Sequence, residues 1–196
     1  MEFLKEHHCK CSEFFEKMYD VFASLHVRNV GTVAGNIMHG SYVSDNIPVF
    51  QVLHAKIGIV NTRTGEKRVI PINELIVDYH VTSLQKYELI QFIEFNQNDT
   101  EDMYYKKLAR RRFDDICIIN SAVRFLRNET GVAKAIISFG SIQYKTERQS
   151  ELEKLFENFV ITKENVLALF EKLPSVVNQY YKVACDFPGE IGRAHV

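Results

Sequence analysis

The sequence predicts an α+β fold, and three observations support that prediction. A helical apolar pattern precedes a run of strand-like segments in the first half of the chain. In the second half, strand-like segments come first and helical patterns follow, which is typical of α+β proteins rather than of strictly alternating α/β proteins. The chain has 196 residues and is 46% hydrophobic, so it is long and apolar enough for one medium domain or two small ones.

The first predicted element is an amphipathic helix over residues 13–25. Its apolar side chains recur at helical spacing: Phe14, Phe15, Met18, Val21, Phe22 and Leu25. A glycine-containing segment follows, from Arg28 to Asn36. Ser44-Asp45-Asn46 then predicts the start of a second helix over residues 47–54. Pro48 falls in its first turn, where a missing backbone N–H costs nothing.

Strands follow in the rest of the first half. Lys56–Asn61 and Lys67–Ile70 flank the turn-forming segment Thr62–Glu66, so we expect a hairpin. Tyr87–Phe95 is a further predicted strand. Asn96–Asp102 is polar and acidic without an apolar pattern, which marks it as a domain boundary. The predicted domains are therefore residues 1–100 and residues 101–196.

The second half begins with predicted strands and continues with predicted helices. Strands are expected at Met103–Arg111, Asp114–Leu126 and Val132–Phe139. Helices are expected at Glu151–Phe159, Lys163–Leu173 and Asn178–Cys185. A turn at Asn128–Gly131 separates the last two strands, and Thr162 is a candidate N-cap for the second helix.

Composition and charge exclude several classes of function. The net charge of −1, with the histidines neutral, gives no electrostatic case for a nucleic-acid or membrane partner. No apolar run is long enough to span a bilayer, and the first ten residues are charged where a signal peptide would be apolar. The four cysteines do not resemble a secreted disulfide framework. We therefore predict a cytoplasmic protein.

Two local clusters invite a functional interpretation that their context does not support. His7-His8-Cys9-Lys10-Cys11 looks like a metal site, but the cysteine spacing is not that of a zinc knuckle and no second Cys/His pair follows. We predict a frayed terminus there and no metal. Arg110-Arg111-Arg112 looks like a nucleic-acid patch, but three residues in a chain of balanced charge are more often a solvated face.

Four segments, taken in order, carry a family resemblance. They are Val27–Ile37, Ser44–Pro48, Glu88–Ile90 and Lys107–Ile116. In that order they resemble the elements R-N-x-G-T-x-G-G-N, S-D-x-x-P, E-x-I/L and K-x-x-x-R-R-x-D-D-I of the FAD-binding subunit of molybdenum-containing hydroxylases, the family of xanthine dehydrogenase and carbon monoxide dehydrogenase. The resemblance runs from about Phe15 to the end of the chain and thins after Glu153. One motif alone would be weak evidence, whereas four in order at matching separations are strong evidence.

The resemblance implies a fold and a role in electron transfer. The first half resembles the second lobe of a PCMH-type FAD-binding domain. The second half resembles the C-terminal domain of the carbon monoxide dehydrogenase flavoprotein, a small antiparallel sheet with helices. Electrons would reach FAD from a molybdopterin-binding large subunit through the 2Fe–2S clusters of a small subunit. They would then pass to an acceptor such as NAD, and no protein residue is expected to act as an acid, base or nucleophile.

By resemblance, eight positions contact FAD. They are Thr32, Val33, Ala34, Gly35, Asn36, Asp45, Ile90 and Lys107. Small residues let several backbone N–H groups approach a pyrophosphate, which suits the first five positions. Asp45 would accept hydrogen bonds from the hydroxyl groups of a ribityl chain, and Ile90 would give an apolar wall beside the flavin. Lys107 would favour the negative charge that develops when the flavin is reduced.

Each of these positions also has an ordinary structural explanation. Gly31 and Gly35, taken alone, mark a turn more often than a phosphate site. Asp45 could be a helix cap, and could be both cap and ligand. Ile90 alone is most simply a core residue, and Lys107 alone is a solvated charge. Only the ordered set favours the functional interpretation.

The sequence also departs from the family pattern. Ala34 stands where the family usually has glycine, and a methyl group there could crowd the phosphate or forbid a positive φ. No glycine-rich A-G-G-x loop, which holds the other side of FAD in the family, precedes Thr32. We therefore expect a fragment, a split subunit or a truncated product that binds FAD poorly by itself. The alternative function is a flavin-free structural or docking subunit of the same kind of complex.

Overall fold

The protein's architecture comes from a computed structural model, which describes residues 11–100, 102–111, 116–143 and 145–185, with side chains as far as residue 179. The chain forms two compact units. The first runs to Phe125 and also takes in Ile136–Gln149, and the second consists of Leu126–Ala135 and the chain from Ser150 onward. This division differs from the predicted domains, 1–100 and 101–196, which stay a prediction.

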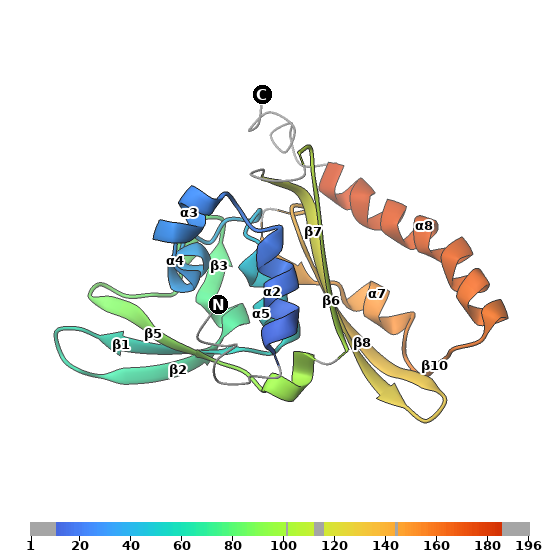
Figure 1. Cartoon of the computed structure of the whole chain (residues 1–196), viewed down its shortest axis with the longest axis horizontal. Helices are drawn as coiled ribbons and strands as arrows, with labels where there is room; N and C mark the ends of the chain where they lie inside the picture. Colours follow the sequence, from blue (N-terminus) through green and yellow to red (C-terminus); the bar gives the residue numbers. More distant parts are fainter. Residues whose placement is uncertain (1–10, 101, 112–115, 144, 186–196) are drawn as a thin grey trace. The chain divides into compact units, whose positions relative to one another are not determined.

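Short helices dominate the start of the first unit (Figure 1). They are α2 (Ser12–Asp20), α3 (Leu25–Val30), α4 (Val33–Met38), α5 (Asn46–Val52), α6 (Ile72–Leu75) and the 3-10 helix η1 (Gln97–Thr100). The helix predicted over 13–25 is wrong in its second part, because α2 ends at Asp20. Ala23 has a positive φ of 40°, which an α-helix cannot accommodate, and Ser24 then caps α3 by accepting a hydrogen bond from the N–H of Val27.

A three-stranded antiparallel sheet in the order β2-β1-β5 follows (Figure 1). Its strands are β1 (Lys56–Asn61), β2 (Lys67–Pro71) and β5 (Glu88–Glu94), which confirms the predicted hairpin and the predicted third strand. Ile57 and Ile59 are buried on one face of β1. On the other face, the ring of Phe92 lies over Gly58, where a Cβ atom would be only 2.3 Å from it. Two short strands, β3 (Ile76–Asp78) and β4 (Val81–Thr82), pair separately.

The second sheet has the strand order β10-β8-β7-β6, with β9 pairing to β8. Its strands are β6 (Met103–Ala109), β7 (Cys117–Asn128), β8 (Gly131–Gly140), β9 (Glu147–Arg148) and β10 (Phe159–Val160). The three strands predicted here are confirmed. The turn at Asn128–Gly131 is also confirmed, because the Asn128 side-chain oxygen accepts hydrogen bonds from the N–H groups of Thr130 and Gly131.

The C-terminal helices differ from the prediction in their bounds. The helix predicted over 151–159 is only α7 (Ser150–Lys154), because Asn158 takes a positive φ and Phe159 enters β10. The two helices predicted after Thr162 are one continuous helix, α8 (Lys163–Cys185), with Pro174 inside it (Figure 1). Thr162 caps α8 as predicted, since its hydroxyl accepts a hydrogen bond from the N–H of Asn165.

The observed mixture of helices and antiparallel sheets confirms the α+β fold class. Most of the core lies in the first unit, where Ile47, Val49 and Val52 of α5 are fully buried. None of the helices in the described part of the chain is long and apolar enough to cross a membrane.

Candidate functional site

A cavity of about 810 Å³ opens beside α2, α3 and α4 in the first unit. Most of the residues that surround it are apolar, aromatic or small. The lining residues are Cys11, Phe15, Tyr19, Phe22, Val27, Arg28, Val30, Gly31, Thr32, Val33, Gly35, Asn36, His39, Asn46, Phe50 and Phe95. Such a concave, largely apolar wall with a few polar groups is the usual character of a small-molecule or cofactor site.

Aromatic rings form one wall of the cavity. The ring centroid of Phe15 lies 6.0 Å from that of Tyr19, 6.1 Å from that of Phe50 and 5.6 Å from that of Phe95. Phe15 and Phe50 are buried, so their rings are held in place by the core. A wall of this kind suits a planar ring system, because aromatic groups attract one another at these separations.

The segment Thr32–Asn36 forms another part of the wall. Thr32 is the N-cap of α4, and its hydroxyl accepts a hydrogen bond of 2.9 Å from the N–H of Gly35. The N–H groups of Val33 and Ala34 open the first turn of the helix, where no carbonyl of the same helix can accept from them. Thr32 and Gly35 are exposed and Val33 is half-buried, so the segment is open to a ligand.

Ala34 fits this backbone without strain. It lies inside α4 and is not among the described residues with a positive φ, so the expected conflict between an alanine methyl and a left-handed conformation does not arise. Gly35 is the position that resists a side chain. A Cβ atom there would lie 2.9 Å from the hydroxyl oxygen of Thr32 and would disturb the cap.

A polar network joins the cavity wall to the start of α5. The side-chain oxygen of Asn36 accepts hydrogen bonds from the Ser44 hydroxyl and from the Asn46 amide, the latter at 2.8 Å. The Tyr19 hydroxyl donates to the Asn46 side-chain oxygen at 2.9 Å. Burial, reinforced by the nearby negative charge of Asp45, raises the pKa of Tyr19 to about 12. The phenol therefore stays a neutral donor at physiological pH.

Asp45 lies one residue from this network but in a separate buried cluster. Its Oδ2 atom forms an ion pair of 2.7 Å with Nζ of Lys107. Its Oδ1 atom accepts a hydrogen bond of 2.7 Å from the Tyr105 hydroxyl and one of 3.1 Å from the Asn120 amide. The Asp45 and Lys107 side chains are only 9% and 5% exposed, so this is a buried ion pair that holds α5 against β6 and β7.

Asp45 is the N-cap residue of α5, but its carboxylate makes no capping hydrogen bond. The capping explanation raised by the sequence is therefore wrong for the side chain. Desolvation and the Asp45 carboxylate both raise the pKa of Tyr105 far above its ordinary value, so Tyr105 donates to Asp45 at any physiological pH.

The structure thus divides the eight predicted positions. Thr32, Val33, Gly35 and Asn36 line the cavity. The other four are not among its described lining residues: Ala34, Asp45, Ile90 and Lys107. Ile90 lies on β5 opposite Ile59, on the face of the sheet that carries the core. The roles of all eight positions as FAD contacts stay a prediction.

Sequence reasoning missed several residues of the cavity. The aromatic residues Phe50 and Phe95 were assigned only to a helix and a strand, and Arg28 was assigned only to a motif. The helical spacing of Phe15 and Tyr19 was a usable signal, because residues four apart share one face of a helix. The place of Phe95 could not be found from local pattern, since it depends on how β5 returns to α2.

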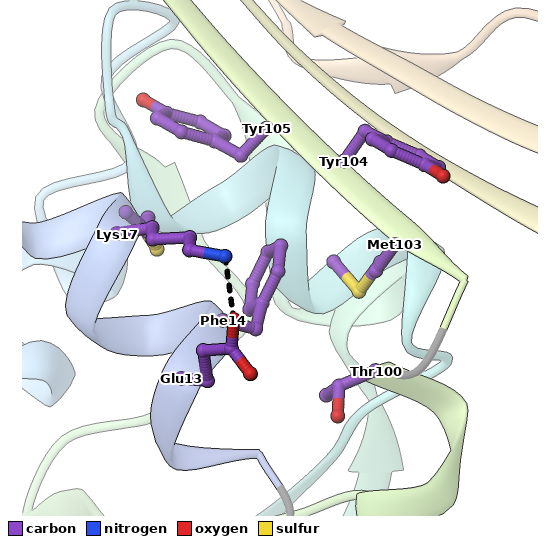
Figure 2. A pocket seen from close by; sticks show the side chains of 8 residues that line it. Glu13, Phe14, Lys17, Thr100, Met103, Tyr104 and Tyr105 are labelled. Atoms are coloured by element: carbon purple, nitrogen blue, oxygen red, sulfur yellow. Dashed lines mark hydrogen bonds and ion pairs between the residues drawn. The ribbon is translucent and has the colours of Figure 1, made fainter.

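A second cavity, of about 480 Å³, lies on another side of α2. Figure 2 shows Phe14 of α2 and Met103 of β6 pointing toward one another across it, with Thr100 beside them. Glu13 and Lys17 pair with each other at 2.6 Å at its rim and are largely exposed (Figure 2). Tyr105, whose hydroxyl holds Asp45, forms part of this wall as well.

The two clusters set aside on sequence grounds fall mostly at the limits of the described chain. Residues 1–10 and Arg112 lie outside the described residues, while Arg110 and Arg111 are exposed. Cys11 is buried and disulfide-bonded, so the expectation of a frayed terminus is wrong at this residue. Within the described chain, no group of three or more His, Cys, Asp or Glu side chains is arranged to hold a metal ion.

The family of this segment follows from a comparison with protein-family models. Residues 2–95 match the model described as "FAD binding domain in molybdopterin dehydrogenase". This part of the chain belongs to that family. The match contains α2 to β5, and therefore the whole Thr32–Asn36 wall of the cavity. It ends just before the polar segment Asn96–Asp102.

Individual relatives agree with this assignment. The chain is 30% identical over 151 residues to xanthine dehydrogenase 2 of Arabidopsis thaliana. The aligned region covers 74% of this chain and 11% of that protein. It is 34% identical over 132 residues to xanthine dehydrogenase of Drosophila subobscura, covering 64% of this chain and 10% of that protein. The chain therefore spans about a tenth of the length of these relatives.

Solved structures show the same fold. Carbon monoxide dehydrogenase from Oligotropha carboxidovorans matches with a TM-score of 0.72 and 18% identity, over 91% of this chain and 68% of that chain. Quinoline 2-oxidoreductase from Pseudomonas putida 86 matches with a TM-score of 0.71 and 19% identity, over 82% of this chain and 55% of that chain. At these identities the likeness extends to the fold alone.

Proposed function

We propose that this chain binds FAD in the cavity beside α2, α3 and α4, and that it serves as the electron-transfer flavoprotein part of a molybdenum-containing hydroxylase. The observation that carries the proposal is the Thr32–Asn36 segment. It forms an open wall of a large apolar cavity, and it lies within the residues that match the FAD-binding domain family.

The residues that are present fit a flavin dinucleotide. The cavity offers buried aromatic rings for a planar ring system and, on the same surface, a segment of small residues whose first N–H groups are not used within α4. Gly35 has no room for a side chain beside the Thr32 hydroxyl. Thr32, Val33, Ala34, Gly35 and Asn36 would thus hold the phosphate-bearing part of the cofactor.

Asp45 and Lys107 are proposed as cofactor contacts too, Asp45 as an acceptor for hydroxyl groups and Lys107 as a cation that favours the negative charge of the reduced flavin. Each is already the other's ion-pair partner, so neither has to be stripped of water when a ligand arrives. Bound FAD supplies the redox chemistry, and the protein positions and tunes it. Ile90 would contribute an apolar contact, and we propose no acid, base or nucleophile from this chain.

The resemblance to xanthine and carbon monoxide dehydrogenases extends the proposal to partners. Electrons would come from a molybdopterin-binding subunit through the 2Fe–2S clusters of another subunit, and an acceptor such as NAD would take them from the flavin. We propose a cytoplasmic location for the assembled enzyme. No nucleic acid or membrane enters this function.

Flavin content is the test of the proposal. The chain is purified with its co-purifying partners, and the visible absorbance of flavin and the identity of the released nucleotide are measured. One FAD per chain is the expected result. A folded complex that carries no flavin, and takes none up from added FAD, would overturn it.

A flavin-free docking subunit is the second candidate. Two observations favour it: Asp45 and Lys107 neutralise each other in a buried pair, and α3 exposes apolar side chains, with Leu25 62% and Val30 83% exposed. Exposed apolar surface of this kind is common at protein–protein contacts. Under this function, the complex would contain the chain in stoichiometric amount but no FAD bound to it.

A further inference from the structure

We propose that Arg28 and His39 are recognition residues for the pyrophosphate of the dinucleotide, so that the cavity selects FAD over flavins without a diphosphate. This inference rests on the proposed function and adds a specificity determinant to it. Both residues line the cavity, Arg28 from α3 and His39 from the end of α4.

The charge of the cavity supports an anionic ligand. Arg28 is the one Asp, Glu, Lys or Arg residue among the described residues that line the cavity. The rest of the described wall is aromatic, aliphatic or small, or carries amide and imidazole groups. Arg28 is exposed at this wall, so its guanidinium is open to an anionic ligand and can donate charge-assisted hydrogen bonds to it.

Arg28 is positioned for this task. Its Nη1 atom donates a hydrogen bond of 2.6 Å to the carbonyl oxygen of Tyr19, near the end of α2. That bond ties a long, flexible side chain to the rim of the cavity. A guanidinium carries five N–H donors, so one such contact leaves donors that can grip two phosphate oxygens at once.

His39 supplies a second donor from a fixed backbone. Its carbonyl oxygen accepts a hydrogen bond of 2.6 Å from Nδ1 of His80. The centroids of the two imidazole rings lie 4.3 Å apart. His39 directly follows α4, whose first residues form the Thr32–Asn36 wall. Arg28 therefore lies on α3, before the Thr32–Asn36 segment, and His39 lies at the C-terminal end of α4, after that segment.

The test compares FAD with riboflavin, which has the same ring system but no phosphate. Binding of each to the chain is titrated by flavin fluorescence for the wild type and for Arg28→Gln, Arg28→Lys and His39→Gln. Arg28→Gln should weaken FAD binding by at least about tenfold and leave riboflavin binding unchanged. Arg28→Lys should lose less FAD affinity than Arg28→Gln, because lysine keeps the positive charge although it cannot form the bidentate contact. His39→Gln should weaken FAD binding alone, by a smaller factor.

Arg63→Gln is the matched control. Arg63 is an exposed arginine that lies 4.1 Å above the ring of Tyr87 and is not among the described lining residues of the cavity. Its substitution should leave the binding of both flavins unchanged. Circular dichroism and the melting temperature show whether each variant is folded.

The outcomes separate this inference from the function beneath it. If the wild type binds FAD and Arg28→Gln binds it equally well, the inference is wrong and the proposed function stands. If folded Arg28→Gln loses FAD and riboflavin to the same extent, Arg28 only shapes the cavity, and the inference is again wrong. If the wild-type chain, purified with its partners, binds neither flavin, both proposals fall.

Discussion

At the scale of single residues, the first unit contains a buried cluster of charged and polar side chains around Asp45. Both carboxylate oxygens are engaged, by Lys107 on one side and by Tyr105 and Asn120 on the other. Buried charges are costly to desolvate, and they are tolerated when they are paired and fully hydrogen-bonded. The cluster satisfies that condition, so it fixes α5 on the second sheet whether or not a cofactor is bound.

Asp45→Asn should destabilise the protein strongly. It leaves the ammonium group of Lys107 buried without its counter-charge, and breaking such a pair costs about 3 kcal/mol or more. Urea denaturation would measure this loss of unfolding free energy. Adding Lys107→Met to Asp45→Asn should recover part of it, because the unpaired charge is then removed.

The exposed pair of Glu13 and Lys17 provides the contrast. Its side chains are 78% and 74% exposed, so solvent screens the pair and Glu13→Gln should leave the free energy of unfolding almost unchanged. If Asp45→Asn were equally harmless, the cluster would not be the clamp that its geometry indicates. Loss of flavin with no loss of stability would instead favour a direct role of Asp45 at the cofactor.

Ala34 offers a second prediction at this scale. The family pattern has glycine here, yet Ala34 lies inside α4 with no positive φ. Ala34→Gly should therefore lower the free energy of unfolding by about 0.5–1 kcal/mol, through helix propensity, and should not improve FAD binding. Melting temperature and FAD titration together check this. A gain in FAD affinity would mean that the alanine methyl crowds the ligand after all.

Residue-scale contacts were only partly predictable from the sequence. The cap of α4 by Thr32 is local, and a hydroxyl three residues before a glycine N–H is a readable signal. The pairing of Asp45 with Lys107 joins positions 62 residues apart, and the Asn120 contact joins positions 75 residues apart. No local pattern encodes such contacts, which arise only when the second sheet closes on α5.

At the scale of elements, the β2-β1-β5 sheet carries a side-chain link across its central strand. Arg68 of β2 reaches over β1 and donates two hydrogen bonds to the Glu88 carboxylate of β5, at 2.9 and 2.7 Å. The same carboxylate accepts a hydrogen bond from the N–H of Gln85. The Arg68 hydrogen bonds, followed by that of Gln85, hold the pKa of Glu88 at about 2.

This link predicts a pH dependence with a definite sign. A carboxyl whose pKa is lower in the folded than in the unfolded chain stabilises the fold above its ordinary pKa of 4.5. That stabilisation is lost progressively as the pH falls from about 4.5 to about 2. Arg68→Gln should make the stability less dependent on pH over this window, as thermal melts in a pH series would detect. Parallel pH curves for the two proteins would show that the link contributes nothing.

The boundaries of helices and strands were predicted correctly where a local sequence pattern defines them. They were predicted wrongly where they depend on contacts with distant parts of the chain. The hairpin of β1 and β2 was correct because alternation and a glycine turn define it. The helix over 13–25 was predicted too long. The helical spacing of apolar residues continues past Ala23, but the backbone leaves the helical conformation after Asp20. β10 was missed because a two-residue strand exists only by pairing with β8. The helices predicted over 163–173 and 178–185 were not joined, although α8 runs continuously through Pro174.

At the scale of the whole molecule, the two units differ in how much apolar surface they bury. The first contains nearly all of the fully buried side chains, including those of α5 and β1. In the second, no side chain of α8 between residues 163 and 179 is buried, and Leu167 and Phe170 are more than half exposed. Regions with few buried contacts open locally at a lower free energy than the core does.

Amide hydrogen exchange should therefore be slow in the core of the first unit and fast in α8. Added FAD should slow exchange in the first unit only. Amides of α5 and β1 are expected to exchange slowly, and those of α8 rapidly, in the free chain. A ligand that binds only the folded first unit stabilises it by about 2.7 kcal/mol at a concentration of one hundred times Kd, which slows exchange through its unfolding about a hundredfold. Exchange of α8 through its own local opening should stay unchanged, because neither the cavity nor the proposed FAD contacts include a residue of α8. Mass spectrometry of peptides from both units, with and without FAD, makes the comparison within one sample. Equal slowing in α8 and α5 would mean that the two units open as one, and the division drawn from their burial would then be wrong.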